Sequence, residues 1–282
     1  MNVGYDLHTH STASDGTLEP AQLVRHAAES DIRMLALTDH DTTAGVAEAA
    51  REAKKLGIAF VPGVEISVTW GSNGIHILGL GIDPECTLLQ QGLESLRDYR
   101  LWRAREIGRR LDERGIPGAY EGALRLAGQG LIARPHFARY LITRGMAPDM
   151  RTVFRRYLVR GKPGYVPSRW ANLEDAVSWI RAAGGQAVIA HPARYPLTRT
   201  RLRKLLGEFV AAGGAGLEVV SGAHNRDEIR TMAFHAHDFG LSASLGSDYH
   251  GPESPWVGLG RLPDLPAGST PIWKDWRDTP PL

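Results

Sequence analysis

The sequence predicts an α/β fold: a (βα) barrel of about seven strands, interrupted by a helical insertion of about 70 residues. Three observations predict it. Short apolar runs alternate with helical patterns in both outer parts of the chain, the middle part shows helical patterns only, and polar residues follow the apolar runs. This alternation is typical of a parallel sheet with crossover helices.

The first part of the chain holds four expected strands and two expected helices. Pro20 suits the first turn of the first helix, and Gly57 stands where a cap should end the second. We expect strands at 5–8, 34–37, 58–64 and 75–82, and helices at 20–30 and 43–56.

The middle part is a series of Arg-rich helices. A long helix is expected at 88–115, and shorter helices follow at 119–127, 135–144 and 150–159, without a strand pattern between them. We therefore expect residues 1–96 and 166–282 to form the barrel domain and residues 97–165 to form an all-helical insertion.

The α/β alternation then resumes. Helices are expected at 173–183, 199–212 and 227–239, and strands at 187–190, 216–220 and 241–245. The last twenty residues are rich in proline and irregular, and we expect a tail that packs on the surface or is partly mobile.

The composition is that of an ordinary globular protein. The 282 residues are 43% hydrophobic and 23% charged, which argues against a largely disordered chain. No apolar run approaches the roughly 18 residues needed to span a bilayer, and the first ten residues lack the features of a signal peptide. Cys86 is the single cysteine, which excludes an intrachain disulfide and favours a cytoplasmic protein.

The charge is unevenly distributed, although the net charge is only +2. The segment from Arg97 to Arg169 holds 17 basic residues against six acidic ones, and the rest of the chain holds 16 basic and 25 acidic residues. A basic segment of this kind indicates an anionic partner, although a charge run is often only a solvated face.

Nine histidine and carboxylate residues lie within or just after the expected strands. A single histidine there is usually structural, but a barrel brings the strand ends together, and so many titratable groups need a counter-charge. Divalent cations supply it, and the His8-x-His10 spacing lets both imidazoles reach one ion. Such ligands suit two or three ions of Mn²⁺, Zn²⁺ or Fe²⁺. The nine are His8, His10, Asp15, His40, Glu65, His76, His191, Asp248 and His250.

Six separated motifs carry these residues: Asp6-Leu7-His8-Thr9-His10-Ser11, Ser14-Asp15-Gly16, Thr38-Asp39-His40, Gly63-Val64-Glu65, His191-Pro192 and Ser247-Asp248-Tyr249-His250. In this order they resemble the motifs of the PHP (polymerase and histidinol phosphatase) family. The resemblance covers residues 4–82 and 186–251. It implies a distorted seven-stranded (βα) barrel that holds up to three metal ions and hydrolyses phosphoesters.

The resemblance also implies a division of the ligands. His8, His10, Glu65 and Asp248 would hold a first ion, and Glu65 would bridge to a second ion held by His76 and His191. Asp15, His40 and His250 would hold a third. Some relatives have histidine in place of Asp15, and a carboxylate favours a harder ion, so Mn²⁺ is the preferred expectation. Asp39 and Asp41 are expected to orient His40 or its loop.

The resemblance implies that a hydroxide shared by two ions attacks the phosphorus atom, with Asp248 and His191 holding the ions that activate it. His224 is a candidate acid for the leaving group or a substrate contact. A serine nucleophile at Ser221 or Ser247 has little support, because neither lies in a Gly-x-Ser-x-Gly turn.

Several residues are candidate substrate contacts. Arg134-Pro135-His136 opens a helix, where N–H groups and arginine can hold a phosphate, and Lys162 lies in a Gly- and Pro-rich loop. Trp102 either stacks a base or anchors the insertion on the barrel. The candidates are Trp102, Arg103, Arg105, Arg134, His136, Lys162, Arg194, Ser221 and His224.

The barrel, the helical insertion, Arg134-Pro135-His136 and the Gly161-Lys162-Pro163 loop resemble the nucleotide-acting branch of the PHP family. This implies that the insertion caps the substrate and that the 3′-phosphate of nucleoside 3′,5′-bisphosphates is removed, giving nucleoside 5′-phosphates. Alternatives are 5′-3′ exoribonuclease activity on short RNA at the same site, histidinol phosphatase activity, and a catalytically silent binding module. The expected partner is a nucleotide or a short oligoribonucleotide, with no membrane and no obligate protein partner.

Overall fold

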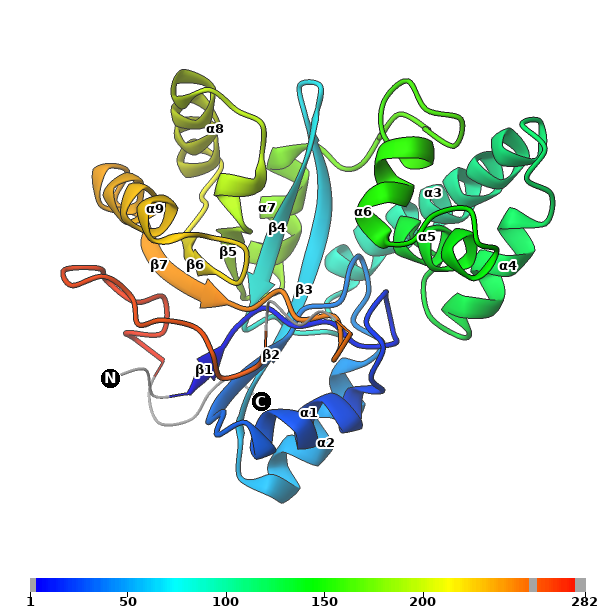
Figure 1. Ribbon diagram of the computed structural model, residues 1–282. Coiled ribbons are helices and arrows are strands. Elements are labelled where there is room, and N and C mark those ends of the chain that lie inside the picture. Colours follow the sequence, from blue (N-terminus) through cyan, green and yellow to red (C-terminus); the bar gives the residue numbers. More distant parts are fainter. Residues whose placement is uncertain (1–3, 254–257, 277–282) are drawn as a thin grey trace.

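The barrel is nearly closed. The computed structural model describes residues 4–253 and 258–276, and within these ranges seven strands form one sheet in the order of the sequence. The Leu7 N–H donates to Leu245 O at 3.1 Å, which brings the first strand against the last (Figure 1). The predicted distorted seven-stranded barrel is confirmed. The strands are β1 (Tyr5–Asp6), β2 (Met34–Leu37), β3 (Ala59–Trp70), β4 (Asn73–Leu80), β5 (Gln186–Ile189), β6 (Gly216–Ser221) and β7 (Ser242–Gly246).

The helices divide into two groups (Figure 1). Those of the first and last parts surround the sheet, and α3 to α6 form a separate helical body beside it. The first group is α1 (Pro20–Glu29), α2 (Val46–Leu56), α7 (Leu173–Ala182), α8 (Arg199–Ala211) and α9 (Arg226–Asp238). The second is α3 (Thr87–Asp112), α4 (Ala119–Ala127), α5 (Arg134–Thr143) and α6 (Met150–Val153).

One expectation about the sheet is wrong. A parallel sheet was expected throughout, but β4 runs antiparallel to both β3 and β5. The reason is local: β3 continues to Trp70, and Gly71, with a φ of 57°, turns the chain straight back into β4. The resulting hairpin projects beyond the barrel, between α8 and α6 (Figure 1). The first residues of β4 therefore lie at the end of the barrel where the parallel strands finish.

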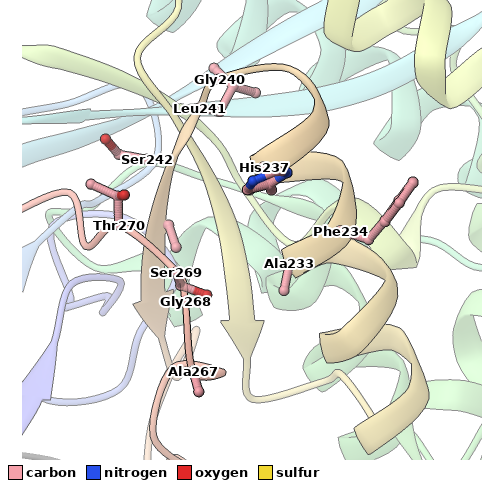
Figure 2. A pocket seen from close by; sticks show the side chains of 12 residues that line it. Ala233, Phe234, His237, Gly240, Leu241, Ser242, Ala267, Gly268, Ser269 and Thr270 are labelled. Atoms are coloured by element: carbon pink, nitrogen blue, oxygen red, sulfur yellow. The ribbon is translucent and has the colours of Figure 1, made fainter.

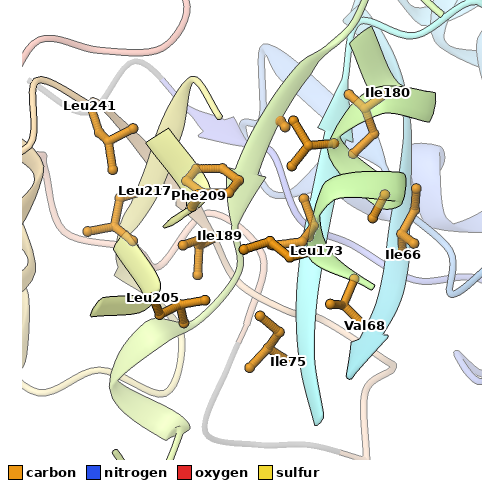
Figure 3. Packing of buried hydrophobic residues seen from close by; sticks show 14 of the residues in the cluster. Ile66, Val68, Ile75, Leu173, Ile180, Ile189, Leu205, Phe209, Leu217 and Leu241 are labelled. Atoms are coloured by element: carbon orange, nitrogen blue, oxygen red, sulfur yellow. The ribbon is translucent and has the colours of Figure 1, made fainter. Parts of the chain in front are cut away.

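The main core lies between the sheet and the outer helices. Val68 and Ile75 of the hairpin lie beside Leu173 of α7, and Phe209 of α8 lies beside Ile189 and Leu217 in the same core (Figure 3). Apolar strand residues alternate between this side and a smaller cluster that includes Leu7, Ala36, Val61 and Leu78. Burial on both sides explains why the strands are continuous apolar runs in the sequence.

Helix α3 connects the barrel and the helical body. Leu89, Leu93 and Leu96 in its first half pack in the barrel core, whereas Ala104 and Leu111 pack in the insertion core. The division expected at residue 97 thus falls inside one continuous helix. Val166, expected in the barrel, packs with the insertion core.

Other differences are small. The helix expected at 43–56 begins only at Val46, and that expected at 150–159 is α6 followed by a π-helical turn, Phe154–Leu158. Gly57 caps α2 in the left-handed region, as predicted, with a φ of 69°. The tail packs on the barrel at Ile272, which is buried, and the expectation for residues 277–282 lies outside the described residues. No helix in the described ranges is long and apolar enough to cross a membrane.

Candidate active site

All nine predicted metal ligands lie at one end of the barrel. His8 and His10 follow β1, His40 follows β2, and Glu65 and His76 lie on the hairpin. The other four lie in loops, with Asp15 after β1, His191 after β5, and Asp248 and His250 after β7. The antiparallel direction of β4 places His76 in this group.

Four of these residues form one compact group. His8 Nε2 lies 3.4 Å from Glu65 Oε1 and 3.4 Å from Asp248 Oδ1, and His10 Nε2 lies 3.2 Å from Asp248 Oδ1. One donor atom from each of the four lies within 4.8 Å of the others, a spacing that one cation can bridge.

Glu65 is shared with a second group. His76 Nδ1 lies 2.8 Å and His191 Nε2 lies 3.1 Å from Glu65 Oε1. His40 Nδ1 lies 2.8 Å from the other oxygen, Oε2. A third group joins His10 and His40 to Asp15 and His250, with His250 Nε2 3.3 Å from Asp15 Oδ1. The candidate ligands thus form overlapping groups that differ in part from the expected division, because His40 also approaches Glu65 and His10 joins Asp15, His40 and His250.

The nine candidate ligands together form the floor of the site, and their donor chemistry fits divalent cations. The buried atoms His8 Nε2, His10 Nε2 and Glu65 Oε2 have no hydrogen-bond partner among the described residues, although they lie close together. Burial alone raises the pKa of the Glu65 carboxyl, but His40, His76 and His8 hold it well below its usual range. The carboxylate is therefore available as a ligand at neutral pH, and bound cations would satisfy the unpaired atoms.

The backbone at the floor is strained. His191 and Asp248 adopt positive φ values of 30° and 57°, and Asp41, next to His40, has a φ of 51°. Residues other than glycine are rare in this region, and such strain concentrates at functional sites.

A second layer of carboxylates orients the floor. Asp39 accepts hydrogen bonds from the Ser11 and Ser14 hydroxyls, each at 2.6 Å, so it ties the loop before Asp15 to the loop that carries His40. Asp41 accepts from the Ser67 N–H at 2.7 Å and pairs with Arg100.

Glu218 belongs to this layer and was missed by the sequence analysis. Its Oε1 lies 2.9 Å from His8 Nδ1, and its Oε2 accepts the His191 N–H at 2.5 Å. This contact fixes the His8 ring with Nε2 toward the floor, as is usual for metal-binding histidine. The available signal in the sequence was a charged residue inside the otherwise apolar run 216–220, and the structure shows that Glu218 is fully buried there.

A cavity of about 230 Å³ opens above the floor. The barrel side contributes ligand residues together with Ser67 and Arg194, whose guanidinium pairs with Asp248. The insertion contributes the basic and aromatic side chains Arg100, Arg103, Arg134 and Phe154, and Trp170, which packs against the barrel core, completes this wall. Of these, Arg100, Phe154, Trp170 and also Ser67 were not predicted from the sequence.

The insertion side is strongly electropositive. Burial, together with Arg134 and Arg100, lowers the pKa of Arg103 to about 9. Burial and the nearby Arg100 also lower the pKa of Arg134. The buried Nε of Arg103 lacks a hydrogen-bond partner among the described residues. An anion in the cavity would relieve both the repulsion and the missing hydrogen bond.

Three predicted substrate contacts lie outside the cavity. Trp102, Arg105 and Lys162 are exposed and do not line it. In this turn of α3, Arg103 and Ala104 face inward. Trp102 and Arg105, on either side of them, therefore point outward.

Three others have contacts that indicate supporting roles. His224 Nε2 accepts the Ala193 N–H at 3.3 Å and Nδ1 donates to Val219 O at 3.1 Å, so the ring bridges two segments and both nitrogens are engaged. His136 is buried, and its Nδ1 accepts the Ala133 N–H at 3.0 Å, which caps α5. Ser221 is buried at the end of β6 and does not line the cavity.

A second cavity lies away from the floor. It has a volume of about 530 Å³, between α9, β7 and residues 267–270 (Figure 2). Its lining is formed mainly by small and apolar residues, with His237 as the titratable side chain among those described. It does not offer the convergent charges of the cavity above the floor.

Comparisons with known proteins agree with this geometry. A family model for the PHP domain matches residues 6–106. A 3′,5′-nucleoside bisphosphate phosphatase of Chromobacterium violaceum is 51% identical over 271 residues, which cover 96% of this chain and 95% of that protein. The 5′-3′ exoribonuclease Rnm of Salmonella typhimurium is 46% identical over 276 residues, covering 97% and 94%.

A similar solved structure is that of an amidohydrolase from Chromobacterium violaceum with bound sulfate and no metal. Its TM-score is 0.92 at 51% identity, over 96% of this chain and 95% of that one. With relatives this similar over nearly their full length, the chain belongs to the PHP-domain family.

Proposed function

We propose that this chain is a metal-dependent phosphatase that removes the 3′-phosphate from nucleoside 3′,5′-bisphosphates and releases nucleoside 5′-phosphates. The observation that carries the proposal is the cavity with two different sides, a floor of imidazoles and carboxylates and a wall of arginines. A substrate with two phosphate groups matches both sides. The relative named as a 3′,5′-nucleoside bisphosphate phosphatase supports the same substrate.

The floor residues would hold two or three divalent ions in the three groups described above. When bound, such ions supply the positive charge that activates water and stabilises negative charge on phosphoryl oxygens. Glu218 fixes the orientation of His8, and Arg194, which pairs with Asp248, would contact the reacting phosphate. Mn²⁺ is the preferred ion, because Asp15 adds a hard carboxylate ligand to the third group.

The insertion would bind the phosphate that does not react. Arg103 is buried, Arg134 is partly buried and the two cations repel each other, so a 5′-phosphate between them would gain charge-assisted hydrogen bonds. The nucleotide would thus be held at one end while its 3′-phosphate lies on the floor. A nucleotide substrate and a single cysteine fit a cytoplasmic enzyme.

A second function at the same site is 5′-3′ exoribonuclease activity on short RNA. The relative named Rnm supports it, and so does the basic insertion, because a 5′-terminal nucleotide of RNA presents the same two phosphates. The two activities differ only in whether the 3′-phosphate carries further nucleotides.

Phosphate release with Mn²⁺ tests the proposal. Adenosine 3′,5′-bisphosphate should be hydrolysed to adenosine 5′-phosphate, histidinol phosphate should be a poor substrate, and EDTA should abolish turnover until Mn²⁺ is restored. Asp248→Asn should remove activity and leave the fold intact by circular dichroism. Turnover of histidinol phosphate without turnover of the bisphosphate would refute the proposal.

A further inference from the structure

An aromatic row runs from the cavity wall to the outer surface of the insertion. Trp170 lines the cavity. The Tyr99 ring lies edge-on to Trp170, with centroids 4.9 Å apart and planes at 89°, and the Trp102 ring lies against Tyr99 at 5.4 Å and 28°. Tyr99 and Trp102 are three residues apart on α3, which places them on the same face of the helix.

The outer ring of this row is open to solvent. Trp102 is 53% exposed and does not belong to either large core of the described residues. It therefore does not serve as the anchor between insertion and barrel that the sequence left as an alternative. Its inner neighbour is fixed, because the Tyr99 hydroxyl donates to Pro167 O at 2.8 Å. The row thus offers a flat apolar surface that is already ordered.

Cationic groups accompany the rings. The guanidinium groups of Arg100 and Arg103 lie over the Trp170 ring, at 5.0 and 5.3 Å from its centroid. Arg103 and Arg169 both act electrostatically on the Tyr99 hydroxyl. Aromatic rings accompanied by arginines are the combination that binds single-stranded nucleic acid, with bases on the rings and phosphates near the cations.

We propose that Trp102 stacks a nucleobase of a single-stranded oligoribonucleotide whose 5′-terminal nucleotide occupies the cavity. The inference rests on the proposed function, because it requires a nucleotide in the cavity. It deepens the second function proposed above by assigning a residue that contacts only the longer substrate. Stacking of this kind tolerates any base, so little sequence preference is expected.

The test compares two substrates in the full-length protein with Mn²⁺. The quantity measured is the ratio of kcat/KM for a 5′-phosphorylated tetraribonucleotide to kcat/KM for adenosine 3′,5′-bisphosphate. Trp102→Ala should lower this ratio about 10-fold, the effect of losing one base–aromatic stack, and Trp102→Phe should retain most of it. Phe234→Ala is the matched control, since Phe234 is 54% exposed on α9, far from the insertion (Figure 1), and should leave the ratio unchanged.

The outcomes separate the two proposals. An unchanged ratio in Trp102→Ala would overturn the inference, and so would a wild-type protein that hydrolyses the bisphosphate but not the tetraribonucleotide; the proposed function would stand in both cases. Hydrolysis of neither substrate would overturn the proposed function. The inference would then be tested by fluorescence anisotropy of a labelled tetraribonucleotide. An affinity about 10-fold weaker in Trp102→Ala would support the inference, and an affinity equal to that of wild type would overturn it.

Discussion

Arg100 of the insertion donates two hydrogen bonds to one carboxylate oxygen of Asp41, from Nε at 2.9 Å and from Nη2 at 2.5 Å. The same Nη2 also donates to Ser67 Oγ at 2.9 Å. Asp41 is fully buried and follows His40, so this pair ties the long helix α3 to the loop that carries a candidate ligand. Because Nε and Nη2 of Arg100 bond to Asp41 and Ser67, Arg100 positions the loop beside the floor, and we expect Arg103 and Arg134 to meet an anion.

The pair should be strongly coupled in stability. Arg100→Met or Asp41→Ala each leaves a buried charge without its partner, and each should destabilise the protein by about 3–5 kcal/mol. The double variant should lose less free energy of unfolding than the sum of the losses in the two single variants. Urea unfolding of the four proteins gives the coupling energy.

Arg109→Met is the control for this cycle. Arg109 pairs with Glu106 and Glu113 on the surface of the same helix and is 56% exposed, so its loss should change stability far less. Strictly additive effects of Arg100→Met and Asp41→Ala would contradict the coupling.

The arginine wall should discriminate substrates by their second phosphate. Arg134→Ala should lower kcat/KM for adenosine 3′,5′-bisphosphate by about 100-fold, the loss of a charge-assisted contact, and should affect adenosine 3′-phosphate only slightly. Arg105→Ala, on the exposed side of α3, should affect neither substrate. Equal losses on both substrates in Arg134→Ala would show that Arg134 is structural.

Glu218 should control metal affinity without contacting the metal. Glu218→Gln keeps the shape of the side chain but weakens the bond that orients His8, and should lower Mn²⁺ affinity about 10- to 100-fold by isothermal titration calorimetry. Glu208→Gln is the control, because Glu208 bonds the Trp70 indole on the outside of the barrel. Unchanged Mn²⁺ affinity in Glu218→Gln would remove its assigned role.

The sequence predicted the barrel and the composition of the floor because both depend on local patterns. Each strand is a short apolar run, and His8, His40 and Asp248 stand at the ends of such runs. The apolar runs and the polar residues that follow them are both visible in the sequence, so the candidate ligands could be predicted together with the strands.

The cavity wall was predicted less well, because it depends on how helices pack in three dimensions. Residues 103 and 105 are both arginine, so the sequence does not distinguish them. Only the packing of α3 decides that Arg103 faces the cavity and Arg105 faces solvent. His224 suggested chemistry by its place after β6, but its ring nitrogens bond to the backbone of Ala193, which is distant in the sequence, and of Val219, on β6 itself. Likewise, the direction of β4 depends on a turn at Gly71 and not on the strand itself.

His136 should make stability depend on pH. Burial, with Asp15 opposing and Arg139 and Arg100 reinforcing, lowers the pKa of His136 from 6.5 to about 4. Between these values the unfolded chain binds a proton that the folded protein does not, so this contribution to stability is complete above pH 6.5 and is lost as the pH falls toward 4. His136→Gln keeps an acceptor for the Ala133 N–H but does not titrate. Between pH 7.5 and 5, wild type should therefore lose about 2 kcal/mol relative to His136→Gln in urea unfolding. His237→Gln, on the exposed side of α9, is the control and should follow wild type at both pH values. A difference between wild type and His136→Gln that stays constant with pH would show that the buried imidazole does not titrate in this range.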